Sequence, residues 1–368
     1  MKHLHIGFIG FGLIGGSIAR NLRNLYPNSR LIAYNYNKEH TNPNLLLAKE
    51  EGTLNAIVTS LNDEFPQCDI IFLCAPVKRN IAYLSSLKGI IKDNCILTDV
   101  GSVKGNIHNA IKELGMEASF IGGHPMAGSE KTGYANSSTR LLNGAFYILT
   151  PTPQTPSHAI TTMQELVSSI GAIPIVLDYD NHDDITAAIS HVPHIIAATL
   201  VNMVRDQDDA QEHMHSLAAG GFKDITRIAS SSPVMWENIC LTNKNSITKF
   251  LDIFIQYIEN IKQAIKTDDS PFLTDYFSRS KEYRDSIPNK PIGMIEKVFE
   301  IYIDVLDKKG AIATIATILA CHDINIKNIG IINNREYSDG ALRIEFYDED
   351  AANEATTLLQ SYNYTIYH

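Results

Sequence analysis

The stretch His5-Ile-Gly-Phe-Ile-Gly10-Phe-Gly12-Leu-Ile-Gly15 decides the fold of the first part of the chain. Its apolar beginning is typical of a buried strand, and the spaced glycines that follow open a helical segment. The first glycine permits a tight turn, the second lets the backbone approach a pyrophosphate, and the third lets helix and strand pack closely. The pattern therefore predicts a dinucleotide-binding turn; a glycine-rich turn without a ligand is the alternative.

Outward from this motif, short β-branched runs alternate with helical pieces up to about Asp178. Near-continuous apolar strands separated by helices indicate a parallel sheet that is covered on both faces. We therefore expect an α/β fold with a doubly wound dinucleotide-binding domain over residues 1–178. The expected strands are His5–Ile9, Arg30–Tyr34, Asp69–Ala75, Cys95–Val100, Ser119–Ile121, Ala145–Thr150 and Ile173–Leu177.

Beyond Asp178 the strand pattern ends, and two further domains are expected. Apolar residues recur at helical spacing over residues 245–266, so residues 179–288 are expected to be all-helical. Prolines and a glycine in the segment 286–293 are typical of a linker. Residues 294–368 then show strand and helix patterns in the order β-α-β-β-α-β, which is typical of a ferredoxin-like sandwich.

Composition excludes several classes of protein. A chain of 368 residues is long enough for two or three domains, and 31 Lys and Arg against 41 Asp and Glu give a net charge of -10, which argues against a nucleic-acid partner. The five cysteines never form a Cys-x-x-Cys pair, which argues against a disulfide framework or a zinc site. No apolar run reaches the roughly 18 residues that cross a bilayer. We expect a cytoplasmic protein with no membrane partner.

The segment Gly122-Gly-His124-Pro-Met-Ala-Gly-Ser-Glu130 follows a predicted strand. It therefore lies at the carboxyl edge of the sheet, where open α/β sheets bind ligands. A histidine there is placed to take a proton near neutral pH, since its ordinary pKa is about 6.5. From this motif alone, a structural role for His124 is an equal alternative.

A further cluster contains His182-Asp183, Ser190-His191-Val-Pro-His194 and Gly220-Gly-Phe-Lys223-Asp-Ile-Thr-Arg227. On a helix, Ser190 and His194 share one face. The histidine spacing lacks the acidic partner of a zinc helix, so no metal is expected, and buried structural histidines are the alternative. Lys223 and Arg227 form a natural carboxylate clamp, or else are solvated helix charges.

Taken together, these segments resemble the prephenate and arogenate dehydrogenases of tyrosine biosynthesis, in family order over roughly the first 290 residues. The resemblance rests on residues 10–17, 99–105, 123–130, 182–194 and 220–227. It implies a Rossmann-like domain, a helical dimerisation domain, a homodimer, and oxidation of prephenate to 4-hydroxyphenylpyruvate with loss of carbon dioxide. The alternatives are an arogenate dehydrogenase, another dehydrogenase with a helical second domain, such as an imino-acid reductase, and a non-catalytic NAD-binding amino-acid sensor.

The resemblance also implies roles for individual residues. His124 is the expected base, and Ser102 is expected to orient the ring hydroxyl. The expected substrate-binding residues are Arg227, His194, Ser190, His182, Glu130 and Lys223. The expected cofactor-binding residues are Gly10, Phe11, Gly12, Leu13, Ile14, Gly15, Asn35 and Pro76. Asn35 stands where an acidic residue usually holds the adenosine ribose, with Lys38 nearby, so NAD is expected with NADP possible.

Residues 294–368 look like an ACT domain, the amino-acid-sensing module that some members of the family carry. The resemblance implies feedback by tyrosine. The expected effector-binding residues lie before the first helix and at the start of the second strand, at Asp307, Gly310 and Asn325. The alternative is a tail that only strengthens dimerisation.

Overall fold

The computed structural model describes residues 3–37, 39–128, 131–287, 299–305, 308–332 and 341–367. The chain divides into two compact units, residues 1–293 and 294–368, each with a core of its own. The predicted effector residue Asp307 and the predicted substrate-binding residue Glu130 lie outside the described residues, as does Lys38.

An eight-stranded sheet forms the first part of the larger unit, in the order β3-β2-β1-β4-β5-β6-β7-β8. Its neighbouring strands run parallel except β6 and β7, which are antiparallel, with His124 opposite Ile148. The strands are β1 (His5–Ile9), β2 (Arg30–Tyr34), β3 (Ala56–Val58), β4 (Ile70–Leu73), β5 (Ile96–Asp99), β6 (Phe120–Pro125), β7 (Phe146–Pro151) and β8 (Ile173–Val176).

Two expectations about this sheet need correction. The expected all-parallel sheet is wrong at the β6–β7 pair, because both strands are buried and therefore carry the same continuous apolar pattern as parallel strands. The sequence analysis also missed β3, which is only three residues long and lies at the edge of the sheet. A strand this short carries too few residues to show a period.

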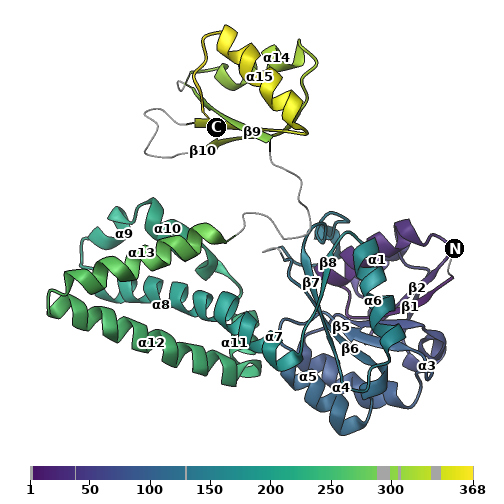
Figure 1. Cartoon of the computed structure of the whole chain (residues 1–368). Helices are drawn as coiled ribbons and strands as arrows, with labels where there is room; N and C mark the ends of the chain where they lie inside the picture. Colours follow the sequence, from purple (N-terminus) through teal and green to yellow (C-terminus); the bar gives the residue numbers. More distant parts are fainter. Residues whose placement is uncertain are drawn as a thin grey trace. The chain divides into compact units, whose positions relative to one another are not determined.

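Helices cover both faces of the sheet, as Figure 1 shows. One face packs against α1 (Leu13–Leu25) and α6 (Ser157–Ser169), and the other against α4 (Val77–Lys88) and α5 (Gly105–Leu114). Two short helices, α2 (Pro43–Glu50) and α3 (Leu61–Glu64), precede β3 and β4. The apolar periodicity of α1 accounts for its burial, since Ile18, Ala19 and Leu22 are fully buried. This part of the unit is therefore doubly wound.

The rest of the larger unit is helical, and α7 (Tyr179–Thr186) joins it to the sheet (Figure 1). The following helices are α8 (Val192–Gln207), α9 (His213–Leu217), α10 (Gly220–Thr226), α11 (Pro233–Thr242), α12 (Lys244–Lys266) and α13 (Ser270–Ser286). A π-helical turn, Ala187–His191, separates α7 from α8. Within the described residues, Tyr179–Gln207 is the one helical stretch long and apolar enough to span a membrane, a property that core helices of soluble proteins share.

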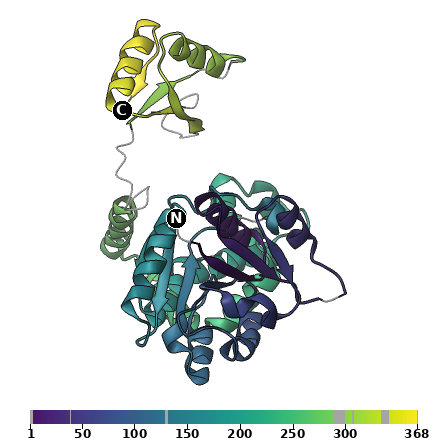
Figure 2. The ribbon, with the colours of Figure 1, turned by 90° about the vertical axis from the view of Figure 1, so that its right-hand side faces the viewer.

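The smaller unit is a four-stranded antiparallel sheet in the order β10-β11-β9-β12, with α14 and α15 on one face (Figure 2). Its elements are β9 (Phe299–Asp304), α14 (Ala311–Ala320), β10 (Ile326–Ile332), β11 (Ala341–Phe346), α15 (Glu349–Ser361) and β12 (Ile366–Tyr367). The predicted order β-α-β-β-α-β is confirmed. Alternation in β9 buries Ile301 and Ile303 against the helices, as the sequence pattern predicts.

Candidate active site

The glycine-rich turn between β1 and α1 is shaped for a dinucleotide. Gly10 has a φ of +85°, and a Cβ there would lie 2.5 Å from the backbone nitrogen of Ala75. A Cβ at Gly15 would lie 3.1 Å from the Cys74 side chain, so this glycine allows the close approach of α1 to the sheet. A Cβ at Gly12 would meet nothing within 4 Å, and no side chain caps the helix there. Open space at a helix N-terminus fits a pyrophosphate.

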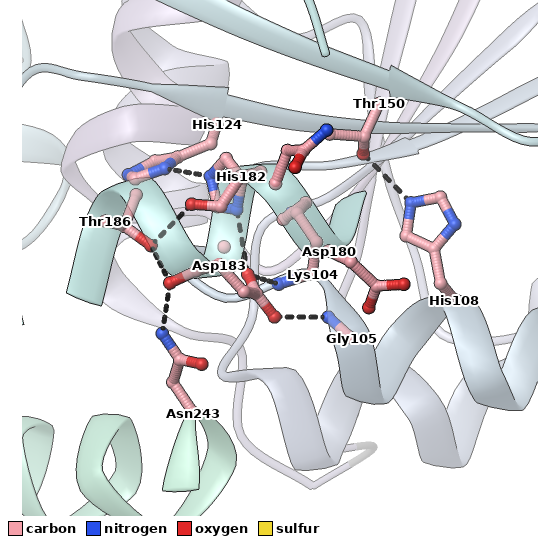
Figure 3. Close-up of polar contacts among 12 residues, drawn as sticks. Lys104, Gly105, His108, His124, Thr150, Asp180, His182, Asp183, Thr186 and Asn243 are labelled. Carbon is pink, nitrogen blue, oxygen red and sulfur yellow. Dashed lines mark hydrogen bonds and ion pairs between the residues drawn. The ribbon is translucent and has the colours of Figure 1, made fainter. Parts of the chain in front are cut away.

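His124, near the end of β6, begins a hydrogen-bonded chain of three side chains (Figure 3). Its Nδ1 lies 2.8 Å from Nε2 of His182, and Nδ1 of His182 lies 2.8 Å from Oδ1 of Asp183. His182 is fully buried on α7. A residue that the sequence places 58 positions away is thus the direct partner of the predicted base.

This chain fixes which nitrogen of His124 accepts a proton. The carboxylate of Asp183 only accepts hydrogen bonds, so Nδ1 of His182 donates and, in the neutral ring, its Nε2 accepts from Nδ1 of His124. Nε2 of His124 then carries the free lone pair. Burial, and after it the neighbouring His182 and Lys104, hold the pKa of His124 well below its ordinary value. The ring is therefore neutral at pH 7 and able to act as a base.

Asp183 is itself held by the ends of two other helices. Its carboxylate oxygens accept the backbone N–H groups of Lys104 and Gly105, each at 2.8 Å, at the beginning of α5. Its backbone carbonyl accepts a hydrogen bond of 2.9 Å from the Asn243 side chain, which also contacts His191. A carboxylate with several fixed donors holds its histidine partner in one orientation.

A buried ion pair supports the strand that carries His124. Lys104 is fully buried; its ammonium contacts the Asp99 carboxylate and donates to the carbonyl of Gly123 at 2.7 Å. Asp99 also accepts the backbone N–H groups of Gly101 and Gly123. Desolvation lowers the pKa of Lys104, and the neighbouring carboxylate of Asp99 opposes that shift. The pair therefore fixes both backbone groups of Gly123, the residue directly before the base, and the loop after β5.

Two clefts receive other predicted residues. Ser102 and Pro76 line a cleft of about 360 Å³ between the carboxyl edge of the sheet and α11. His194 lines a second cleft, of about 500 Å³, between α8 and α11. Its ring stacks on Trp236 at 3.9 Å between centroids, and its Nδ1 donates to the carbonyl of Ser190 at 2.9 Å. His124 lines neither of these two clefts, and its direct side-chain partner is His182.

The predicted carboxylate clamp lies on the surface of the helical part. Lys223 in α10 and Arg227, at the start of the 3-10 turn after it, are both exposed. Neither side chain makes a hydrogen bond or ion pair with another described residue. Both cations are therefore open to a ligand or to a second subunit, but this structure does not place them against His124.

Asn35 is occupied by its own loop. It is 1% exposed, and its amide nitrogen donates to the carbonyls of Asn37 and His40 while its oxygen accepts from the N–H of Asn42. The predicted hydrogen bond to a ribose would require this loop to rearrange. The amide instead ties the backbone of Asn37, His40 and Asn42 to the end of β2.

Sequence reasoning missed several residues of this site. Lys104 and Asp99 belong to the family segment 99–105, but the sequence analysis assigned them no function. Only the fold shows that their side chains meet beside β6. Asn243 and Trp236 carry no local signal. The adjacent pair His182-Asp183 was the available signal for the hydrogen-bonded chain.

Known proteins resemble this chain over nearly its whole length. It is 36% identical to the prephenate dehydrogenase of Bacillus subtilis over 96% of this chain and 94% of the relative. This chain belongs to the prephenate dehydrogenase family. Within that family it is also 32% identical to the prephenate dehydrogenase of Lactococcus lactis, over 96% of each chain. The models of the prephenate dehydrogenase nucleotide-binding and dimerization domains match residues 18–176 and 178–279.

Solved structures of the prephenate dehydrogenase family agree with the larger unit. The prephenate dehydrogenase of A. aeolicus, in complex with hydroxyphenyl propionate and NAD+, has a TM-score of 0.71 and 29% identity, covering 78% of this chain and 99% of that one. The arogenate dehydrogenase of Synechocystis has a TM-score of 0.70 and 27% identity, covering 77% and 100%. The sequence-based assignment to the family is confirmed.

Proposed function

We propose that this chain is a prephenate dehydrogenase that oxidises and decarboxylates prephenate to 4-hydroxyphenylpyruvate with NAD+. The observation that carries the proposal is the hydrogen-bonded chain from His124 through His182 to Asp183, which supplies a neutral, oriented base at the carboxyl edge of the sheet. The relatives named above support the choice of substrate.

His124 takes the proton of the ring hydroxyl through Nε2. NAD+, when bound, accepts the hydride from the carbon that carries this hydroxyl. As His124 becomes charged, the carboxylate of Asp183 stabilises the positive charge through His182. The electron pair released with carbon dioxide makes the ring aromatic and leaves a phenolate, which takes the proton back from His124, so the reaction proceeds strongly downhill.

Other residues hold the substrate in this proposal. Ser102 orients the ring hydroxyl, and Arg227 binds the carboxylate of the pyruvyl side chain with help from Lys223. A tight clamp on the departing carboxylate would oppose decarboxylation, so the cations serve the other one. The residues that line and order the pocket are His182, Ser190, His194 and Glu130.

The cofactor occupies the turn after β1. Gly10, Gly12 and Gly15 give the pyrophosphate its space, and Phe11, Leu13 and Ile14 belong to the same turn and to the first turn of α1. Pro76 lines the cleft that also contains Ser102, so it lies near the nicotinamide end. NAD is the cofactor, and the absence of an acidic residue at position 35 leaves the site able to take NADP.

One assay tests the activity and separates the alternatives. Absorbance at 340 nm is followed with NAD+ and prephenate, with NAD+ and arogenate, and with NAD+ alone. Reduction of NAD+ with prephenate supports the proposal. Reduction with arogenate alone would show an arogenate dehydrogenase, and tight NAD+ binding without reduction would show a non-catalytic sensor.

Assembly and location follow from the same family. The helical part exposes Ile253, Ile255, Ile258 and Ile265 on α12, which is more apolar surface than a monomer needs to display. The matching dimerization domain supports a homodimer through this part of the chain. The enzyme works in the cytoplasm, like other enzymes of small-molecule biosynthesis.

The smaller unit is a regulatory ACT domain that binds tyrosine in this proposal. Its strand order supports the assignment. Gly310 has a φ of +88° and precedes α14, whose first turn has no side-chain cap, and Asn325 is exposed before β10. Backbone N–H groups and the Asn325 amide would bind the carboxylate and amino group of the effector, together with Asp307.

A further inference from the structure

At the adenosine end of the cofactor site, the side chain that usually binds the ribose is not free to do so. In most dinucleotide sites a side chain at the end of the second strand bonds the ribose hydroxyls. Here that side chain, Asn35, makes three hydrogen bonds to the backbone of its own loop and is buried. Its N–H also bonds the carbonyl of Val58 at the end of β3. The side chain that binds the adenosine ribose must therefore belong to a residue next to Asn35 and not to Asn35 itself.

The next residue, Tyr36, forms a pair with a cation from another element. Tyr36 is 61% exposed, and the guanidinium of Arg79 lies 5.6 Å from the centroid of its ring. Arg79 lies in the first turn of α4, immediately after the loop that contacts Gly10. The pair thus lies across the carboxyl edge of the sheet from the glycine-rich turn that receives the pyrophosphate.

This pair sits on a rigid base. Tyr34 in β2 packs edge-on against Tyr83 in α4, with centroids 5.6 Å apart, so β2 and α4 are held together one turn below. Asn37 accepts the N–H groups of Glu39 and His40, which closes the loop on the other side. Because these side chains and this loop are already fixed, a ligand that binds here loses little free energy in ordering them.

The charge of Arg79 is available. It is exposed and has no ion pair with a carboxylate among the described residues. Glu39, the acidic residue of the neighbouring loop, is also exposed and makes no ion pair with it there. A guanidinium on an aromatic ring can stack on a base and still direct its N–H groups at a phosphate.

We propose that Tyr36 and Arg79 form the adenosine subsite, and that Arg79 binds the 2'-phosphate of NADP+, so that the enzyme uses both dinucleotides. The inference rests on the proposed function only in taking the turn after β1 as the cofactor site. An acidic residue at position 35 would repel a phosphate monoester. The amide of Asn35 is neutral and already hydrogen-bonded to its own loop, so it does not repel one. A charge-assisted, two-point contact from Arg79 then supplies the attraction.

The test measures binding directly on the full-length enzyme, by isothermal titration calorimetry with NAD+ and NADP+ at two salt concentrations. The wild type should bind NADP+ within about tenfold of NAD+, with the steeper salt dependence for NADP+. Arg79→Gln should weaken NADP+ by about 10- to 100-fold and NAD+ by about threefold or less, and should remove the extra salt dependence. Lys88→Gln, an exposed cation at the other end of α4, is the matched control and should change neither.

Other results would overturn the proposal. Equal weakening of both dinucleotides by Arg79→Gln would show that Arg79 only stacks on adenine. A wild type that binds NAD+ and oxidises prephenate but discriminates against NADP+ by more than about a thousandfold would refute this inference and leave the proposed function intact. Binding of neither dinucleotide would instead refute the cofactor site itself.

Discussion

At the scale of single residues, the sequence predicted positions in the fold that depend on local spacing. The three glycines lie in the turn after β1 and His124 lies near the end of β6, and both places could be predicted because a turn and a strand end are local features. The contact between His124 and His182 could not be predicted, since it joins residues 58 positions apart and depends on how α7 packs against the sheet. The role of Asn35 stays a prediction: its position suggests a ligand contact, and in this structure its side chain hydrogen-bonds its own loop.

Gly12 gives a test that separates folding from binding. Its φ of −112° is open to alanine, and a Cβ there would meet no protein atom within 4 Å, so Gly12→Ala should leave the free energy of unfolding nearly unchanged. The same methyl group would occupy the space in which the pyrophosphate approaches the backbone, and the affinity for NAD+ should fall by about 100-fold. Calorimetry with NAD+ and thermal unfolding measure the two effects.

The matched control is Gly89→Ala, at the exposed end of α4, where a Cβ also has open space and φ is −83°. It should change neither quantity. If Gly12→Ala bound NAD+ as the wild type does, the pyrophosphate could not lie against this turn.

His124 gives the corresponding test of chemistry. Without a base at the ring hydroxyl, His124→Asn should lower kcat by about 100-fold or more with little change in KM. Because burial and neighbouring groups hold the pKa of His124 well below its ordinary value, kcat/KM of the wild type should stay level as the pH falls through 6.5 and decline only at lower pH. Steady-state rates at 340 nm measure both.

His158→Asn is the control, since His158 is an exposed histidine on α6. It should retain wild-type kinetics. Near-normal turnover of His124→Asn would exclude His124 as the base.

At the scale of elements, the pattern of apolar runs predicted the strands and helices well but not the direction of every strand. β7 returns antiparallel to β6 through a segment that includes the turn Tyr134–Asn136, and a buried antiparallel strand has no pattern of its own. The contact of α5 with β7 is likewise a tertiary feature. His108 on α5 lies 2.9 Å from the hydroxyl of Thr150 and stacks on Tyr179 at 4.4 Å.

This contact makes stability depend on pH. Burial lowers the pKa of His108 to about 4, so between pH 6.5 and 4 the unfolded chain binds a proton that the folded chain does not. The free energy of unfolding should therefore fall as the pH falls through this window and level off below it. For His108 the loss from pH 7.5 to pH 5 is about 2 kcal/mol. His191, whose pKa burial also lowers to about 4, adds a loss in the same direction.

Urea unfolding, followed by the fluorescence of Trp236, the only tryptophan of the chain, measures this loss at the two pH values. His108→Gln keeps a polar partner for Thr150 but does not titrate, so its loss should be smaller than that of the wild type by about 2 kcal/mol. His158→Gln should behave like the wild type. Equal losses in all three proteins would mean that His108 is not the titrating group.

At the scale of the whole molecule, the sequence predicted three kinds of architecture in the right order. Composition and period change between the sheet, the helical part and the small sandwich, and such changes are visible without tertiary information. The sequence shows that α12 carries an apolar stripe, but it does not show that this stripe is exposed. A stripe that faces a second subunit has the same period as one that faces a core.

We expect tyrosine to inhibit the full-length enzyme through residues 294–368. This unit has its own core, built from Ile301, Ile303, Ile344 and Phe346 with the two helices, so residues 1–289 can be studied without it. In a titration of tyrosine against prephenate oxidation, saturating prephenate should not fully relieve inhibition of the full-length enzyme, because the effector and the substrate bind at different sites.

Two variants locate the effector site. The chain that ends at Asn289 and the full-length Asn325→Ala variant should both escape this inhibition while keeping their activity, and Asn353→Ala, on the exposed face of α15, should remain sensitive. Tyrosine resembles the product in its phenol ring and carboxylate, so some competition at the active site is expected in every variant. If inhibition were equal and purely competitive in all of them, tyrosine would act only as a product mimic in the active site. The smaller unit would then strengthen dimerisation and would not mediate feedback.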